Sequence, residues 1–183
     1  MKRIISLLIL VAGYHMAADA QSHFRAGLGY YGENMVHPGL VLELEHEPFF
    51  TERFSLPLRA DFGFHTNPDY KAWTMDLHKG FRKYFRSGLF LEQSVGVGVI
   101  AKGYRTDYWY MDDYYNPIPH GNTTVWGFMP SVTAGAGYKL SGKKEGGDLL
   151  WVRPKVYWDL GFRGFHLPYF ALQIGYSHTF KTK

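Results

Sequence analysis

The sequence contains no cysteine in its 183 residues. That absence excludes disulfide frameworks, thiol nucleophiles, thiolate metal sites and a lipid anchor on cysteine. The sequence also lacks an apolar run of the roughly 20 residues that a membrane-spanning helix needs. The formal net charge is only +4, and the basic residues form no patch, so the charge pattern gives no indication of nucleic-acid binding.

The first 20 residues have the pattern of a secretory signal peptide. Lys2 and Arg3 form a basic start, residues 4–12 are apolar, and Ala18 and Ala20 fit a small-x-small cleavage site. We therefore predict that residues 1–20 are a signal peptide and that residues 21–183 form one exported domain. An exported domain without a basic patch is not expected to meet nucleic acid.

What the sequence has in abundance is alternation at period two. In residues 89–103, LFLEQSVGVGVIAKG, every second residue is mostly aliphatic, and the residues between are mostly glycine or charged. Successive side chains of a strand point to opposite faces, so this is a strand pattern. Eight such segments occur, at residues 23–31, 39–47, 54–64, 72–85, 89–104, 125–140, 149–162 and 168–180. Plain polar turns alternate with longer connections that carry prolines and aromatics. The pattern predicts an all-β fold, an eight-stranded antiparallel up-and-down transmembrane β-barrel with both ends of the chain in the periplasm.

The two faces of the predicted strands differ in character. One face is aliphatic in mid-strand, as at Leu58 and Val97, and aromatic toward strand ends, as at Trp73 and Trp126, which is typical of a lipid-facing wall. The other face combines glycine with charges of both signs. Charges in a narrow interior must be paired to offset their desolvation, so we expect a polar, salt-bridged lumen that is plugged. The residues predicted to form this network are Arg25, Glu43, Glu45, Arg59, Asp61, Asp76, Arg82, Glu92, Arg153, Lys155 and Asp159.

A soluble exported barrel of the lipocalin kind is the alternative, with the faces reversed. An eight-stranded barrel has room inside for only a modest set of side chains. Large apolar residues from all eight strands would overfill it, and the charges would be left outside. The faces therefore favour the membrane barrel.

The chain resembles the small eight-stranded outer-membrane β-barrel proteins of diderm (Gram-negative) bacteria, a superfamily of small adhesin, opacity and porin-like barrels. The signal peptide, the eight alternating strands, the difference between turns and loops, and the final strand LPYFALQIGYSHTF carry the resemblance over residues 21–183. Family members usually end in an aromatic residue, whereas Phe180 is followed by Lys181, Thr182 and Lys183. The resemblance implies a location in the cell outer membrane, in contact with its lipid and lipopolysaccharide. It is one of architecture and implies no site residues, and we expect a monomer.

No catalytic residue is predicted. A serine nucleophile needs a histidine within hydrogen-bond reach, and the adjacent Ser177 and His178 point to opposite faces of their strand. A metal site is not predicted either, because no compact ligand motif occurs, and no cofactor is expected. Histidines do fall one in each longer connection, where convergent loops could offer them to zinc or copper with aspartates nearby. These residues are His37, His65, His120 and His166, with Asp69, Asp112 and Asp113.

The longest connection, YRTDYWYMDDYYNPIPH at residues 104–120, interleaves aromatic residues with aspartates. Tyrosine and tryptophan give large contact area at low entropy cost, which suits sugar or protein recognition. Alternatively, the flanking strands extend past the membrane and these rings pack on one another. The ligand-binding residues predicted here are Trp109, Tyr110, Asp112, Asp113 and Tyr114.

The leading hypothesis is a non-enzymatic outer-membrane barrel whose loops serve adhesion or recognition of a glycan or surface protein. The two alternatives are a lipid-modifying outer-membrane enzyme and a narrow channel for small solutes. A fold alone does not choose among them.

Overall fold

The computed structural model describes residues 23–104, 108–111, 117–120, 124–140, 147–161 and 168–180. Its strands are β1 (His23–Glu33), β2 (His37–Glu47), β3 (Phe54–Ser55), β4 (Leu58–Thr66), β5 (Tyr70–Tyr84), β6 (Leu89–Tyr104), β7 (Tyr108–Met111), β8 (Pro117–His120), β9 (Thr124–Lys139), β10 (Leu149–Trp158) and β11 (Pro168–Phe180). Within these ranges no helix is long and apolar enough to cross a membrane. The predicted signal peptide lies outside the described residues.

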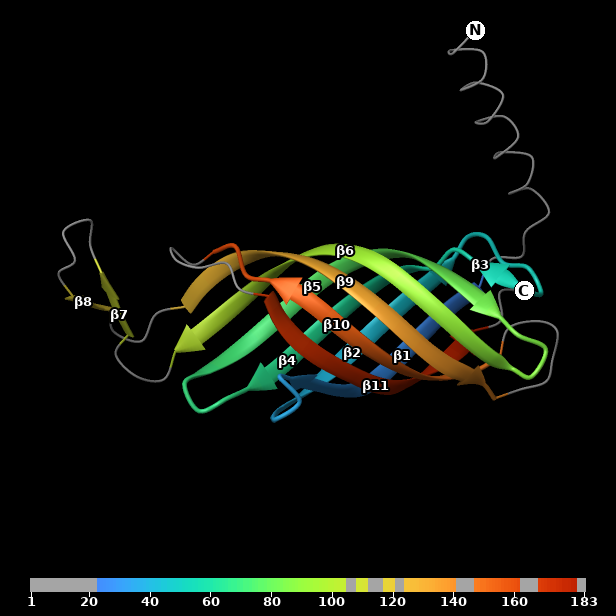
Figure 1. Cartoon of the computed structure of the whole chain (residues 1–183), viewed down its shortest axis with the longest axis horizontal. Helices are drawn as coiled ribbons and strands as arrows, with labels where there is room; N and C mark the ends of the chain where they lie inside the picture. The colour runs from blue at the N-terminus through green and yellow to red at the C-terminus, as the bar shows by residue number, and fades with distance from the viewer. Residues whose placement is uncertain are drawn as a thin grey trace, which may run out of the picture.

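Strand pairing closes a single barrel (Figure 1). Antiparallel neighbours follow the order β5, β4, β2, β1, β11, β10, β9 and β6, and pairing of β6 with β5 completes the ring. Both β3 and β4 pair with β5 in one continuous register, so together they form one strand interrupted at Pro57, which has no N–H to donate. The Pro57 carbonyl still accepts the Gly80 N–H at 2.9 Å. The predicted all-β, closed eight-stranded antiparallel barrel is therefore confirmed.

The two ends of the barrel carry different connections. We call the end with connections 34–36, 67–69, 105–123 and 159–167 the loop end, and the end with connections 48–53, 85–88 and 140–148 the turn end. The first two loop-end connections are shorter than predicted, because β1, β2, β4 and β5 all extend further toward this end. Asn34 takes the positive φ of 48° that such a tight turn requires. β10 stops at Trp158, before the predicted end at residue 162.

Strands β7 and β8 belong to the longest connection and pair with each other. Figure 1 shows this hairpin beyond the loop end of the barrel. β6 ends at Tyr104 and β9 begins at Thr124, and β7 and β8 form an antiparallel pair in the connection between them.

The outer wall is apolar around the whole ring. Aliphatic side chains such as Leu28 and Val95 point outward in mid-strand, and Val95 is 64% exposed. Exposed aromatic residues flank them, with Trp73 and Trp126 toward the loop end and Phe180 at the turn end. An apolar surface this continuous is unsuited to water and matches the lipid-facing band of a membrane barrel with aromatic girdles.

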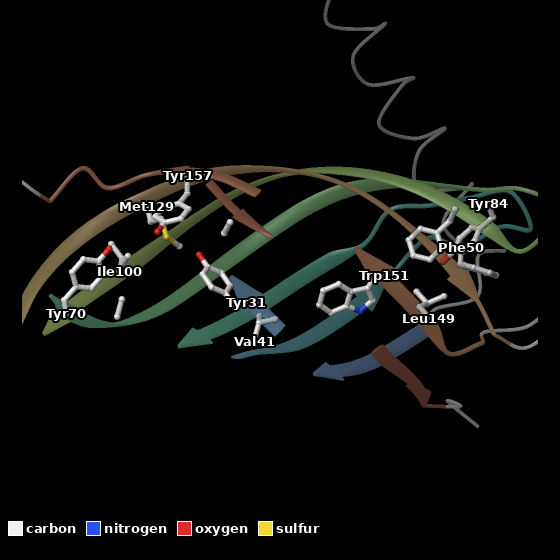
Figure 2. Packing of buried hydrophobic residues seen from close by; sticks show 13 residues of the cluster. Tyr31, Val41, Phe50, Tyr70, Tyr84, Ile100, Met129, Leu149, Trp151 and Tyr157 are labelled. Atoms are coloured by element: carbon white, nitrogen blue, oxygen red, sulfur yellow. The ribbon is translucent and has the colours of Figure 1, made fainter. Parts of the chain in front are cut away.

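Inside, the barrel is filled in layers. Figure 2 shows the buried apolar side chains spread along the interior, from Tyr70 and Ile100 at one end to Phe50 and Tyr84 at the other. By position along the strands and connections, the loop-end group is Tyr31, Val41, Tyr70, Ile100, Met129 and Tyr157, and the turn-end group is Phe50, Tyr84, Phe90, Leu149 and Trp151. Along β2, β5, β6 and β10, most inward charged residues lie between these two groups, so the predicted polar lumen is bounded by apolar residues that the sequence pattern does not reveal. These charged residues are Glu43, Glu45, Glu47, Asp76, Arg82, Glu92, Arg153 and Lys155.

One outward side chain departs from the apolar wall near the middle of β5. Lys79 is exposed on the outer face, six residues after Trp73 and six before Phe85. A lysine near the bilayer midplane of a barrel is unfavourable by about 2–4 kcal/mol. We therefore expect Lys79→Leu to raise the free energy of unfolding of the purified barrel in phospholipid bilayers by about 2–4 kcal/mol.

A urea titration of protein folded into vesicles measures this change. Lys71→Leu, at the loop-end rim of the same strand, is the matched control and should have an effect below about 1 kcal/mol, because lysines at the interface cost little. Equal effects of the two substitutions would mean that Lys79 reaches water.

Candidate functional site

The interior charges form the largest polar cluster of the described residues. All eleven residues of the predicted network are buried, and Arg25, Arg82 and Arg153 have no exposed surface. Ten of them come from β1, β2, β4, β5, β6 and β10, whose inward residues alternate with the outward apolar ones, and Asp159 directly follows β10. Pairing across strands, rather than along one strand, therefore brings the charges together.

Arg82 is the centre of the network. Its guanidinium lies 2.6 Å from Glu45, 2.9 Å from Glu47 and 2.6 Å from Glu92. It also lies over the Phe90 ring, 5.0 Å from the centroid. Planar guanidinium groups make such multiple bonds to carboxylates well, and the geometry ties β5 to β2 and β6.

The remaining arginines extend this cluster across the lumen. Arg25 pairs with Glu45 and Glu47, Arg59 with Asp61 and Glu92, and Arg153 with Glu43 and Glu92. Each carboxylate of this group thus meets at least one guanidinium. These ion pairs lie in the lumen between the two apolar groups, on the path that a channel would have to take.

A second group lies next to it, toward the loop end. Lys155 Nζ lies 2.5 Å from Asp76, whose Oδ1 is also 2.7 Å from His78 Nε2. Ser94 Oγ is 3.4 Å from His78 Nδ1 and 2.6 Å from Thr133 Oγ1. The sequence pattern missed this serine–histidine–aspartate arrangement, because Ser94 and His78 lie on neighbouring strands and cannot be matched by spacing along one strand.

The arrangement can relay a proton between its members, but a hydrolase also needs access for its substrate. Ser94 is 8% exposed and faces the lumen, away from lipid. Asp76 is already paired with Lys155, so it is not free to act only on the histidine. We therefore interpret this group as part of the interior hydrogen-bond network.

Asp61, Asp76 and His78 also offer ligand atoms within 4.8 Å of one another. The Arg59 side chain lies 3.0 Å from Asp61, and the Lys155 ammonium forms an ion pair with Asp76. Both carboxylates thus already have cationic partners, and we assign no metal to them.

Two acidic groups lie apart from the central network, near the loop end. Asp159 pairs with Lys102 at 2.8 Å, so this member of the predicted network is a separate ion pair. Glu33, which the predicted first strand excluded by ending at Tyr31, is fully buried. Its carboxylate accepts hydrogen bonds from Tyr157 at 2.5 Å and Tyr70 at 3.0 Å.

Two of the histidines considered as metal ligands meet at Glu33. His65 Nε2 lies 3.3 Å from one carboxylate oxygen and His37 Nδ1 lies 3.4 Å from the other. These two histidines therefore approach each other at the loop end of the barrel, around the Glu33 carboxylate. His166 lies outside the described residues, and of His120 the structure describes the backbone at the end of β8.

The predicted loop site falls only partly within the described chain. Trp109 and Tyr110 belong to β7, whose backbone pairs with β8 through Pro119 and Ile118. Asp112, Asp113 and Tyr114 lie outside the described residues. The structure therefore describes the backbone of the β7–β8 hairpin and the register of its pairing.

On the outer wall at the turn end, a small polar group surrounds Asp148. Its carboxylate accepts from the Tyr176 hydroxyl at 2.5 Å and the Thr179 N–H at 3.1 Å, and it lies 3.0 Å from His178 Nδ1. Partial burial alone would raise the pKa of Asp148, but these hydrogen bonds hold it below the ordinary value for an aspartate. Ser177, in contrast, points inward and donates to Glu43 at 2.8 Å, so Ser177 and His178 do not form a pair.

Comparisons with known proteins support the architecture. The structure is similar to the crystal structure of Neisserial surface protein A (NspA), with a TM-score of 0.52 and 6% identity over 88% of this chain and 97% of that chain. The chain has the fold of an outer-membrane β-barrel. A further match is the N-terminal β-barrel domain of Pseudomonas aeruginosa OprF, with a TM-score of 0.41 and 11% identity over 87% of this chain and 100% of that domain. No protein-family model and no curated protein matches the sequence.

Proposed function

We propose that the protein is a plugged, non-enzymatic barrel of the outer membrane that presents its loop end to the cell exterior for adhesion or recognition. The observation that carries this proposal is the combination of a filled lumen with a hairpin that stands beyond the barrel. The interior carries two apolar layers and an ion network. The longest connection between barrel strands is the one that contains β7 and β8.

The composition of that connection supports a glycan or a surface protein as the ligand class. Residues 104–120 contain five tyrosines, one tryptophan and three aspartates. Aromatic rings provide rigid contact area, and carboxylates accept hydrogen bonds from sugar hydroxyls or pair with cationic side chains. Trp109, Tyr110 and Tyr114 are the stacking candidates, and Asp112 and Asp113 the polar ones.

The barrel itself does not need a connection of this length. Adjacent antiparallel strands can be joined by a few residues, as residues 34–36 and 67–69 do at the same end. Connections much longer than this are usually functional or disordered, and a segment so rich in aromatics is a poor candidate for disorder.

Replacing residues 107–122 with a two-residue Gly-Asn turn tests the proposal. We expect the shortened barrel to fold, seen as a change in gel mobility between unheated and boiled samples in detergent. We also expect binding to the glycans or surface proteins that the intact barrel selects from arrays to fall at least tenfold. A stacking residue contributes about 1–3 kcal/mol at an interface, so losing several is sufficient for this change.

The matched control replaces residues 141–146, at the turn end, with the same Gly-Asn turn, and should bind as the unmodified protein does. A shortened loop that binds normally would place recognition elsewhere. A shortened barrel that does not fold would make the hairpin a structural element.

A further inference from the structure

Two polar side chains stand on the outer wall in a region that is otherwise apolar. Lys79 on β5 and Gln93 on β6 are both exposed and point outward. Their outward neighbours are apolar: Leu58 and Val95 pair with Lys79, and Phe81 and Ala134 pair with Gln93. Other polar outward residues of the described strands, such as Lys71, Lys83 and His178, lie near strand ends.

The two residues lie at a similar depth. The register row through Lys79 runs from His46 near the turn end of β2, through Leu58 and Val95, to the loop-end half of β11 at Phe170. The β6 residue of a register pair therefore lies nearer the loop end than its partner on β5. Gln93 lies two residues from Val95 in the direction of the turn end. This displacement offsets the difference in depth between Val95 and Lys79, so Gln93 lies near the depth of Lys79.

Lipid head groups do not reach this depth. Six residues of a tilted strand separate Lys79 from each aromatic rim, roughly 15 Å along the membrane normal. That exceeds what a lysine side chain covers by bending toward the interface. In the described residues, Lys79 has no ion pair or hydrogen bond through its ammonium, so its charge has no partner within the barrel wall.

A second copy of the chain does not supply the missing charge. The outward residues of the described barrel strands include no aspartate or glutamate. A symmetric pair of copies could hydrogen-bond Lys79 to Gln93 of the other copy, but it would also bring two ammonium groups together in a medium of low dielectric constant, where like charges repel strongly.

We propose that Lys79 and Gln93 form a docking site, inside the membrane, for another membrane-embedded protein that presents an aspartate or glutamate at the same depth. A carboxylate there neutralises Lys79 and accepts from the Gln93 amide. Ionisable groups within a membrane are costly and commonly mark a functional contact with a specific partner. Ala134 and Ala136 lie beside Gln93 and Leu91 in the register, and small residues allow close approach of a second backbone.

Site-specific photo-crosslinking in intact cells tests this site. A photoreactive amino acid replaces Val95, which pairs with Lys79 and faces outward, in the full-length chain. We expect one adduct with a different membrane protein, identified by mass spectrometry. Its yield should fall at least about tenfold when Lys79→Met or Gln93→Leu is added, since loss of a membrane-buried polar contact is worth a factor of this size.

The deciding result is a charge exchange. Lys79→Glu should abolish the adduct, and changing the partner's facing aspartate or glutamate to lysine should restore it. Lys71→Met is the control and should leave the yield unchanged. The heat-dependent gel shift establishes that each variant is folded.

Four results overturn the proposal: no adduct, an adduct only with a second copy of the chain, an adduct unaffected by Lys79→Met, or a partner with no acidic residue whose reversal restores the Lys79→Glu variant. An adduct that meets the charge-exchange criterion supports it.

Discussion

Replacing Arg82 with methionine should lower the free energy of unfolding of the barrel by about 3–5 kcal/mol. The guanidinium is fully buried and contacts three carboxylates, those of Glu45, Glu47 and Glu92. Methionine fills part of the same volume but removes one positive charge from the network. Glu45 and Glu47 then share Arg25, and Glu92 keeps Arg59 and Arg153, so the buried cluster carries an uncompensated negative charge. An excess buried charge is costly because water does not replace the missing partner.

A denaturant titration of the protein in detergent micelles or bilayers measures this loss. Arg86→Met, in the exposed turn between β5 and β6, is the matched control and should change stability by less than about 1 kcal/mol. A small effect of Arg82→Met together with a change in planar-bilayer conductance would contradict the plugged lumen, because a hydrated channel would supply water to the stranded carboxylates. Adding Glu92→Gln to the Arg82 variant should recover part of the loss.

Replacing Trp151 with alanine should cost a similar amount, about 3–5 kcal/mol, for a different reason. The indole is 3% exposed and its Nε1 donates to Ser177 Oγ at 2.7 Å. Its ring lies against the backbones of Gly29 and Gly175, where an added Cβ would come within 2.7 Å of the ring edge in both cases. It also stacks on the Arg153 guanidinium at 4.0 Å. Truncation leaves a cavity beside the ion network that the rigid barrel cannot collapse to fill.

The same titration measures this effect, with Trp126→Ala as the control. Trp126 is 67% exposed on the outer wall, so its removal leaves no cavity and should cost clearly less. If both substitutions cost the same, the indole of Trp151 is not packed as described, and the glycines beside it have another role.

Much of this architecture can be predicted from the sequence, because strand periodicity is a local property. Alternation at period two assigned the inward face to Arg82, Glu92 and Arg153 and the outward face to Val95 and Trp73 without knowledge of any strand partner. The same argument failed at the strand ends, where Glu33 belongs to β1 because of its pairing with His37 and Ala171 rather than because of its own neighbours in sequence. Trp151, Tyr31 and Tyr157 also lie inward by the same alternation, whereas the predicted lumen consisted of glycine and charged residues.

The sequence by itself determined the fold class, the number of strands and the sorting of side chains between lumen and outer wall, since each follows from which residues are two apart. Only the tertiary structure decided which charges meet: Arg82 and Glu45 are 37 residues apart, and His78 and Ser94 are 16 apart. It also decided the separation of Asp159 from the central network and the apolar layers at both ends. These depend on register and on closure of the ring, because sliding one strand by two residues keeps every side chain on its face and changes every partner.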